Sequence, residues 1–176
     1  GFHTHSNESQ FDVEQTLERF KIRPIQALEK FGLLKAPKTL LAHCVWADDN
    51  EIALMAQGNI GVAHNPISNM KLASGAAPVV AMLKAGVNLG LGTDGEKENN
   101  NLDMFEEMKV SSLLAKFSSL DAAALDAWDI CRMATIGGAK ALGLDHVTGS
   151  LEVGKSADMI AVRCDTPRMT PLIDSG

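Results

Sequence analysis

TLLAHC, at Thr39–Cys44, is a short apolar run that ends in a histidine and a cysteine. Its length and composition are typical of a buried strand. Three other stretches have the same design, because each is a strand-like segment followed by polar side chains. They are GFHTHSNE at Gly1–Glu8, IGVAHN at Ile60–Asn65 and VNLGLGTD at Val87–Asp94. Reactive groups at the carboxyl ends of parallel strands are typical of an α/β barrel with its site on one rim.

Helical patterns separate these four strand-like runs. Strands and helices that alternate at intervals of about 25 residues predict βα units on a parallel sheet. A complete eightfold barrel has about 250 residues, so this chain of 176 residues is expected to supply four units of one. The helices before the last strand are expected at residues 11–20, 25–31, 48–57 and 78–86, with Asp48 or Asp49 as the cap of the third.

Leu102–Phe117 predicts the clearest amphipathic helix of the chain. Its large apolar side chains can share one buried face, and its charged residues would then face solvent. The expected core residues are Leu102, Phe105, Met108, Leu113 and Phe117, and the expected outward residues are Glu106, Glu107 and Lys109.

The last part of the chain changes in character. Asp121 is expected to cap a further helix, which Gly137–Gly138 should interrupt. Beyond it the sequence is rich in turn residues, and Met159–Val162 has the composition of a strand. We therefore expect a half-barrel over residues 1–147 and the start of a small β domain over 148–176.

Composition excludes several classes of partner. The net charge of −6 and the pI near 5.3 argue against nucleic acid and anionic membranes, which favour basic patches. No run approaches the roughly 18 apolar residues that a membrane span needs. The three cysteines are odd in number and widely spaced, so a disulfide framework is not expected. Without a signal-like start, this pattern favours the cytoplasm.

The first polar cluster combines two histidines and a glutamate. His3 and His5 are two residues apart on a strand, so their side chains share a face. Imidazole pairs of this kind can bind zinc or iron. Glu8 is close enough in sequence to reach a water on such a metal and to transfer its proton. The alternative is that both histidines are ordinary side chains near an exposed chain end.

The other strand ends carry further candidates. His43 could act in the site, although a single histidine at a strand end is more often a hydrogen-bonded structural residue. Cys44 is expected to be a small buried side chain and not a nucleophile. Asp94 lies between glycines after an apolar strand, where it could bind a metal, take a proton or form an ordinary turn. The succession of three histidines and an aspartate predicts a metal-dependent hydrolytic site.

Two segments beside these candidates are predicted to be loops. In HNPISN, at His64–Asn69, the amide and hydroxyl side chains are expected to hold a loop together by hydrogen bonds to backbone. His64 itself could line the pocket or support it from behind. Residues 96–101 (EKENNN) are expected to form a solvated loop.

The order of these groups and the sequence around them resemble the amidohydrolase superfamily. Within it, the resemblance is to the aminoaryl deaminase branch of the 5-methylthioadenosine/S-adenosylhomocysteine deaminases, and it covers nearly the whole chain. The matching stretches are His5-x-x-Glu8, LLAHC at Leu40–Cys44, HNPISNMKLASG at His64–Gly75, LGTDG at Leu91–Gly95, NNNLDMFEEMK at Asn99–Lys109 and GSLEVGKSAD at Gly149–Asp158.

The resemblance implies an α/β fold that is a partial TIM (β/α)8 barrel, strands five to eight, with the start of a small β-sandwich. It implies one divalent metal, zinc or alternatively iron, held by His5 and Asp94. Glu8 would carry a proton from water to a ring nitrogen, and His43 would orient the water or the substrate. Asp94 would also act as a base. The substrate would be a small aminopurine-like molecule that loses ammonia.

One part of the family's metal shell has no counterpart here. The family's barrel opens with an H-x-H pair on strand one, and His3-Thr4-His5 is similar to it. The stretches that follow, however, place this pair on strand five. His5 and Asp94 alone would hold a metal weakly, and His3 is the candidate for a further ligand.

Three functional interpretations therefore stay open. The first is a deaminase of the 5-methylthioadenosine/S-adenosylhomocysteine type, of which this chain is an incomplete fragment. The second is another reaction at the same site, either guanine deamination or the hydrolytic dechlorination of a triazine. The third is an inactive half-barrel without metal. Its exposed strand edges would favour self-association, so a homo-oligomer is expected.

Overall fold

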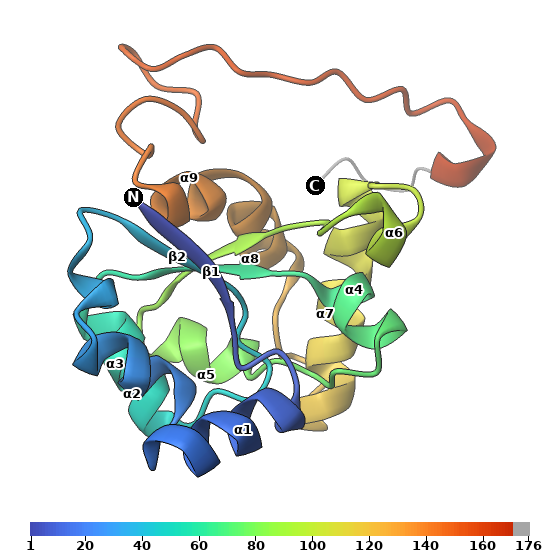
Figure 1. The fold of residues 1–176 in the computed structure, drawn as a ribbon. Coiled ribbons are helices and arrows are strands. Elements are labelled where there is room, and N and C mark those ends of the chain that lie inside the picture. Colours follow the sequence, from blue (N-terminus) through green and yellow to red (C-terminus); the bar gives the residue numbers. More distant parts are fainter. Residues whose placement is uncertain (171–176) are drawn as a thin grey trace.

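Four parallel strands form the centre of the molecule in the computed structural model, which describes residues 1–170 (Figure 1). The strands are hydrogen-bonded in chain order, so β1 and β4 are the outer strands of the sheet. All four predicted strands are confirmed, each to within one residue. Their bounds are β1 Phe2–Ser6, β2 Thr39–His43, β3 Gly61–His64 and β4 Asn88–Leu91.

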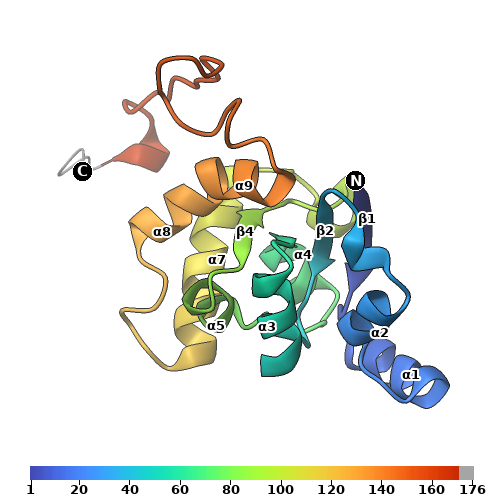
Figure 2. The same ribbon diagram turned by 90° about the vertical axis from the view of Figure 1, so that its left-hand side faces the viewer.

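Helices connect successive strands and bury one face of the sheet. Apolar side chains from β2, β3 and β4 meet those of α2, α3 and α5 on this face. Figure 2 shows these three helices on the side of the sheet away from α9. The core residues Leu41, Val62, Met55 and Met82 have no exposed surface, and each such side chain contributes about 1.5–3 kcal/mol by burial. The helices are α1 Gln10–Phe20, α2 Pro24–Lys30, α3 Asp49–Gln57, α4 Pro66–Lys71, α5 Val79–Lys84, α6 Glu96–Asn99, α7 Met104–Ser119, α8 Ala127–Arg132 and α9 Gly138–Leu142, with 3-10 turns at Leu33–Lys35 and Pro167–Met169.

Helix α9 lies against the opposite face of the sheet. Gly61 and Gly90 alternate with core residues along their strands, so they face away from the core. A Cβ atom on Gly61 would lie 2.1 Å from the carbonyl oxygen of Ala141, and one on Gly90 would lie 2.7 Å from the Cα of Gly138. The helix can approach the strands this closely only because both strand positions lack a side chain.

The predicted interruption of the helix at Gly137–Gly138 is wrong. The chain continues without a break from α8 through a π-helical segment, η2 (Met133–Gly137), into α9. A Cβ on Gly137 would lie 2.5 Å from the carbonyl oxygen of Leu89. These glycines therefore permit close packing on β4, and they do not act as helix breakers.

Helix α7 forms where it is predicted, but it buries a different face. The side that packs against α4 and α5 carries small side chains and one glutamate. Of the five apolar residues expected in the core, only Met108 packs against it. The buried residues are Glu107, Ser111 and Ala115, and the exposed ones are Leu102, Phe105, Leu113 and Phe117.

Two predictions for the last third of the chain are also corrected. Asp121 caps only a short turn through the amide of Ala123, and α8 is capped by Asp126. Met159–Val162 forms no strand in the structure and lies in an exposed segment that leads away from the sheet (Figure 1). The prediction for the chain beyond residue 170 lies outside the described residues. Within residues 1–170, no helix is both long enough and apolar enough to span a membrane.

Candidate active site

Residues with left-handed backbone stand at three of the four strand ends. Asn7 follows β1 with φ of 52°, His43 ends β2 with φ of 71°, and Asp94 follows β4 with φ of 60°. This conformation is uncommon for residues other than glycine, and strained backbone of this kind clusters at functional sites. The chain is thus bent at the positions where the predicted reactive side chains begin.

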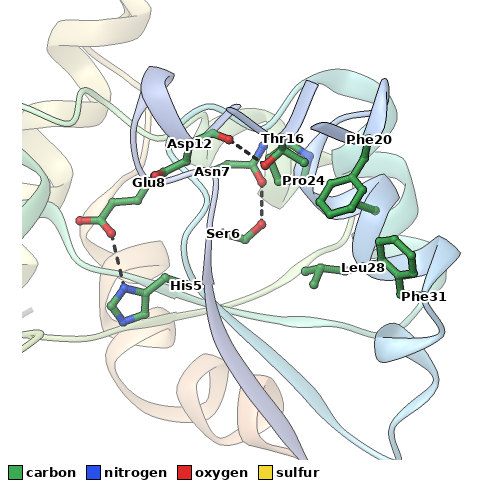
Figure 3. Close-up of a pocket in the computed structure, with 11 residues that line it drawn as sticks. His5, Ser6, Asn7, Glu8, Asp12, Thr16, Phe20, Pro24, Leu28 and Phe31 are labelled. Atoms are coloured by element: carbon green, nitrogen blue, oxygen red, sulfur yellow. Dashed lines mark hydrogen bonds and ion pairs between the residues drawn. The ribbon is translucent and has the colours of Figure 1, made fainter. Parts of the chain in front are cut away.

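Three predicted residues come together at the ends of β1 and β2. Glu8 Oε2 lies 3.4 Å from His5 Nδ1 and 3.7 Å from His43 Nε2. The two imidazole rings meet edge to face, with their centroids 4.8 Å apart. Figure 3 shows the Glu8 carboxylate reaching toward His5 from the turn after β1. One ligand atom from each residue lies within 4.8 Å of the others, a spacing that could hold a metal ion.

Asp94, which follows β4, approaches His43 from the other side of the sheet edge. Its Oδ2 is 3.8 Å from His43 Nε2 and accepts a hydrogen bond of 2.6 Å from Ser68 Oγ. Partial burial raises the pKa of Asp94. The hydrogen bonds from Ser68 and the Gly95 amide, together with the nearby histidines His43 and His5, lower the pKa by more than burial raises it. The net pKa of Asp94 lies below its ordinary value, so this carboxylate is ionised near neutral pH.

His43 is the central member of this group. Its side chain is 1% exposed, and its Nδ1 lies 2.9 Å from Asn69 Oδ1. Because an amide oxygen only accepts, Nδ1 carries the hydrogen and Nε2 presents its lone pair toward Glu8 and Asp94. Nε2 is buried and makes no hydrogen bond among the described residues. In this position Nε2 can contact a water or a substrate that lies between the two carboxylates.

The other two candidate histidines do not join the group. His3 is exposed and precedes His5 on the same strand face, outside the set of ligand atoms. His64 is buried at the end of β3, and burial, with His43 nearby, lowers the pKa of His64 to about 4. His64 is therefore neutral near pH 7.

Two residues of α4 have contacts that sequence reasoning missed. Ser68 and Asn69 were expected to hold a loop together, but they lie on a buried helix that begins with Pro66 at its first turn. Their side chains contact Asp94 and His43. The proline after Asn65 was the available signal, because proline favours the first turn of a helix.

Cys44 is buried beside His43, as predicted. Burial raises the pKa of the thiol, and the carboxylate of Glu51 raises it further. The thiolate is therefore not formed near neutral pH, which excludes Cys44 as a nucleophile.

A cavity of about 490 Å³ lies beside β1 and continues from the site (Figure 3). One end is polar and includes His5 and Glu8 of the site, and the other end is formed by aromatic and aliphatic side chains of α1, of α2 and of the residue that ends α2. Such a combination suits a small molecule with a polar end and an apolar end. The polar end includes His5, Asn7, Glu8 and Asp12, and the apolar end includes Phe20, Leu28 and Phe31.

Comparison with known proteins gives a consistent family. Residues 1–173 match the sequence model of the amidohydrolase family. A 5'-deoxyadenosine deaminase of Methanosarcina acetivorans is 49% identical over 174 residues, which are 99% of this chain and 40% of that protein. A 5-methylthioadenosine/S-adenosylhomocysteine deaminase of Desulforudis audaxviator is 47% identical over 97% of this chain and 40% of its own length.

Solved structures give the same result. The crystal structure of an adenosine deaminase from Xanthomonas campestris with bound zinc superimposes with a TM-score of 0.91. The two sequences are 40% identical over 98% of this chain and 39% of that chain. The chain thus spans about 40% of the length of the curated relatives that it matches.

Proposed function

The chain belongs to the amidohydrolase family, and we propose that it forms part of a metal-dependent deaminase of an adenosine-like aminopurine. The observation that carries this proposal is the arrangement around His43. Its buried Nε2 has carboxylate oxygens of Glu8 and Asp94 at 3.7 and 3.8 Å. The activity belongs to a longer protein, because the related deaminases are more than twice as long as this chain.

The fold proposal places this chain in the second half of a barrel. In it, β1 to β4 are strands five to eight, residues 1–147 form the half-barrel, and residues 148–176 begin a small β-sandwich. The parallel sheet in chain order supports this placement, as does the similarity to amidohydrolases that extends over almost the whole chain. Strands one to four would pair with the outer strands and complete the wall of the cavity beside β1.

The metal proposal assigns His5 and Asp94 as ligands, with His3 as the alternative further ligand. Zinc is the proposed ion, and iron is the alternative. A bound divalent ion would supply a water that is activated for attack near neutral pH. The lowered pKa of Asp94 supports its role, because an ionised carboxylate binds cations without first losing a proton.

Each remaining step is assigned to a residue of this chain. The Asp94 carboxylate takes a proton from the attacking water. Glu8 carries a proton to a ring nitrogen, and it stands 24% exposed where a substrate can reach it. His43 is held by the contact of its Nδ1 with Asn69 Oδ1 and orients the water or substrate through Nε2. Water thus adds at the amino-bearing carbon. One of its two protons passes through Glu8 to the ring nitrogen, the other passes through Asp94 to the amino group, and ammonia leaves as the carbonyl forms.

Two other interpretations are weaker. Guanine deamination or triazine dechlorination would use the same residues, but the relatives at 47–49% identity are named for adenosine-like substrates. An inactive half-barrel without metal would not need the left-handed turns that bring three residues together. A homo-oligomer and a cytoplasmic location remain part of the proposal, and the three free cysteines suit a reducing compartment.

Substitutions at the two carboxylates test the proposal in a full-length enzyme that contains this chain. Glu8→Gln should lower turnover of 5'-deoxyadenosine by at least about a hundredfold, the range of general acid–base catalysis, and should leave metal content intact. Asp94→Asn should lower both metal content and turnover. Near-normal turnover of Glu8→Gln would remove Glu8 from the reaction, and full metal content of Asp94→Asn would remove Asp94 from the ligands.

A further inference from the structure

A buried carboxylate lies behind the end of β1 and takes no part in the proposed chemistry. Glu51, in the first turn of α3, has no exposed surface. Its two carboxylate oxygens accept four hydrogen bonds, all from N–H groups. A carboxylate that is buried with an arginine and further donors is well compensated. The donors are Asn7 Nδ2 (2.9 Å), Arg23 Nε (2.9 Å), the Ile25 amide (2.9 Å) and the Asp48 amide (3.2 Å).

Asn7 connects Glu51 to the candidate site. Its side-chain amide donates to Glu51, and its Oδ1 accepts a hydrogen bond of 2.7 Å from Ser6 Oγ. Its backbone carbonyl accepts a hydrogen bond of 2.9 Å from the amide of Trp46, in the loop after β2. These contacts hold the left-handed backbone of Asn7 in place, at φ of 52°.

The residues before and after Glu8 in the sequence are both held in place by hydrogen bonds. Asn7 precedes it, and Ser9 follows as the cap of α1. The Ser9 side chain accepts from the Asp12 amide, and its own amide donates to the Asp12 carboxylate at 2.9 Å. With both neighbours fixed, the position of the Glu8 carboxylate depends on the direction of the Asn7–Glu8 peptide and on the side chain's own rotations.

We propose that Glu51 is a positioning residue, which acts through Asn7 to hold the turn that directs Glu8 toward His43. This inference rests on the proposed function, because it needs Glu8 to move a proton. A misplacement of about 1 Å can reduce a rate about a hundredfold. Loss of the Glu51 support should thus lower kcat, while KM and metal content change little.

Glu51→Gln is the test substitution, made in the full-length enzyme. Glutamine keeps the size of the side chain but sets an NH2 group against at least one of the four donors. We expect kcat for 5'-deoxyadenosine to fall at least about tenfold, within the range for residues that support a site from behind. KM should stay within about twofold, because Glu51 does not touch the cavity.

A double-substitution cycle tests the route through Asn7. Asn7→Gly tolerates the left-handed backbone but removes the amide that reaches Glu51. It should lower kcat by itself, and Glu51→Gln should then add no further loss. If the two losses multiply, Glu51 does not act through Asn7 and the inference is overturned. If Glu51→Gln does not fold, Asn7→Gly alone carries the test, and an unchanged kcat overturns the inference.

Hydrogen exchange gives a readout that needs neither metal nor turnover. The Trp46 amide, which donates to the Asn7 carbonyl, should exchange faster in Glu51→Gln than in the parent. The matched control is Asp48→Ala, because Asp48 pairs with Arg23 and caps α3 but does not touch Asn7. The control should lose stability and keep kcat within about threefold of the parent.

The results separate the two proposals. If Glu8→Gln turns over normally, the proposed function fails at Glu8. If Glu8→Gln is inactive while Glu51→Gln keeps full kcat and normal exchange at Trp46, the proposed function stands and Glu51 is only structural.

Discussion

Two fully buried glutamates, Glu51 in α3 and Glu107 in α7, lie in different charge environments. Glu51 lies behind β1 and β2, where it pairs with Arg23 and accepts three further hydrogen bonds. Glu107 lies behind β3 and β4 and accepts from Asn99 Nδ2 and from the Ile67 amide at 3.3 Å. Among the described residues, no cation forms an ion pair with Glu107.

The difference lies in the partners and not in burial, since neither glutamate has exposed surface. Burial raises the pKa of Glu107 to about 7, despite the hydrogen bonds from Ile67 and Asn99, and the nearby carboxylates Glu106 and Asp94 raise it as well. The two side chains are equally buried, but Glu51 has the Arg23 guanidinium against it, whereas Glu107 gains or loses a proton near neutral pH beside α4.

The largest expected effect is on stability at pH 7. Glu51→Gln should lower the free energy of unfolding by about 2–3 kcal/mol, because Arg23 loses its buried partner and one donor is left opposed. Glu107→Gln should change it by less than about 1 kcal/mol, since a neutral amide resembles the protonated acid. Denaturant unfolding of the two variants measures both values, and equal losses would contradict the comparison.

Most of the fold follows from local patterns that the sequence displays. The four strands are marked by short apolar runs, and the cap at Asp48 is marked by its position before α3. The proximity of Glu8, His43 and Asp94 was also predictable, because parallel strands bring their carboxyl ends to one edge of a sheet.

Glu107 could not be predicted in the same way. Its partners Asn99 and Ile67 come from other segments, so nothing in the periodicity of α7 marks it as buried. Hydrophobic periodicity assigned the core to Phe105 and Phe117, whereas tertiary packing buries the side with the smaller residues. Ser68 and Asn69 were missed for a related reason, because side-chain contacts between distant segments leave no local pattern.

A pH titration sharpens the contrast at the second glutamate. The folded pKa of Glu107, about 7, is above its unfolded value near 4.5. The folded state thus binds the extra proton between these values, and Glu107 makes stability fall as the pH rises from 4.5 to 7. Relative to the parent, Glu107→Gln should gain about 2 kcal/mol across this window. If the curves of stability against pH for the parent and for Glu107→Gln run parallel, the pKa of Glu107 is not raised in the folded protein.

His64 gives the most specific test, because its pH effect is similar in size to that of Glu107 but has the opposite sign. Its folded pKa of about 4 is below the unfolded 6.5, so its contribution is present above pH 6.5 and is lost as the pH falls toward 4. In the parent, the contributions of His64 and Glu107 to the slope of stability against pH oppose each other between pH 4.5 and 6.5. His64→Gln should remove the His64 slope and leave stability falling with pH, by about 2 kcal/mol more than in the parent. Urea unfolding at several pH values measures this, and the double variant with Glu107→Gln should return to a nearly flat profile. If His64→Gln instead steepens the loss of stability toward acid, then His64 is not the neutral buried group that the structure describes.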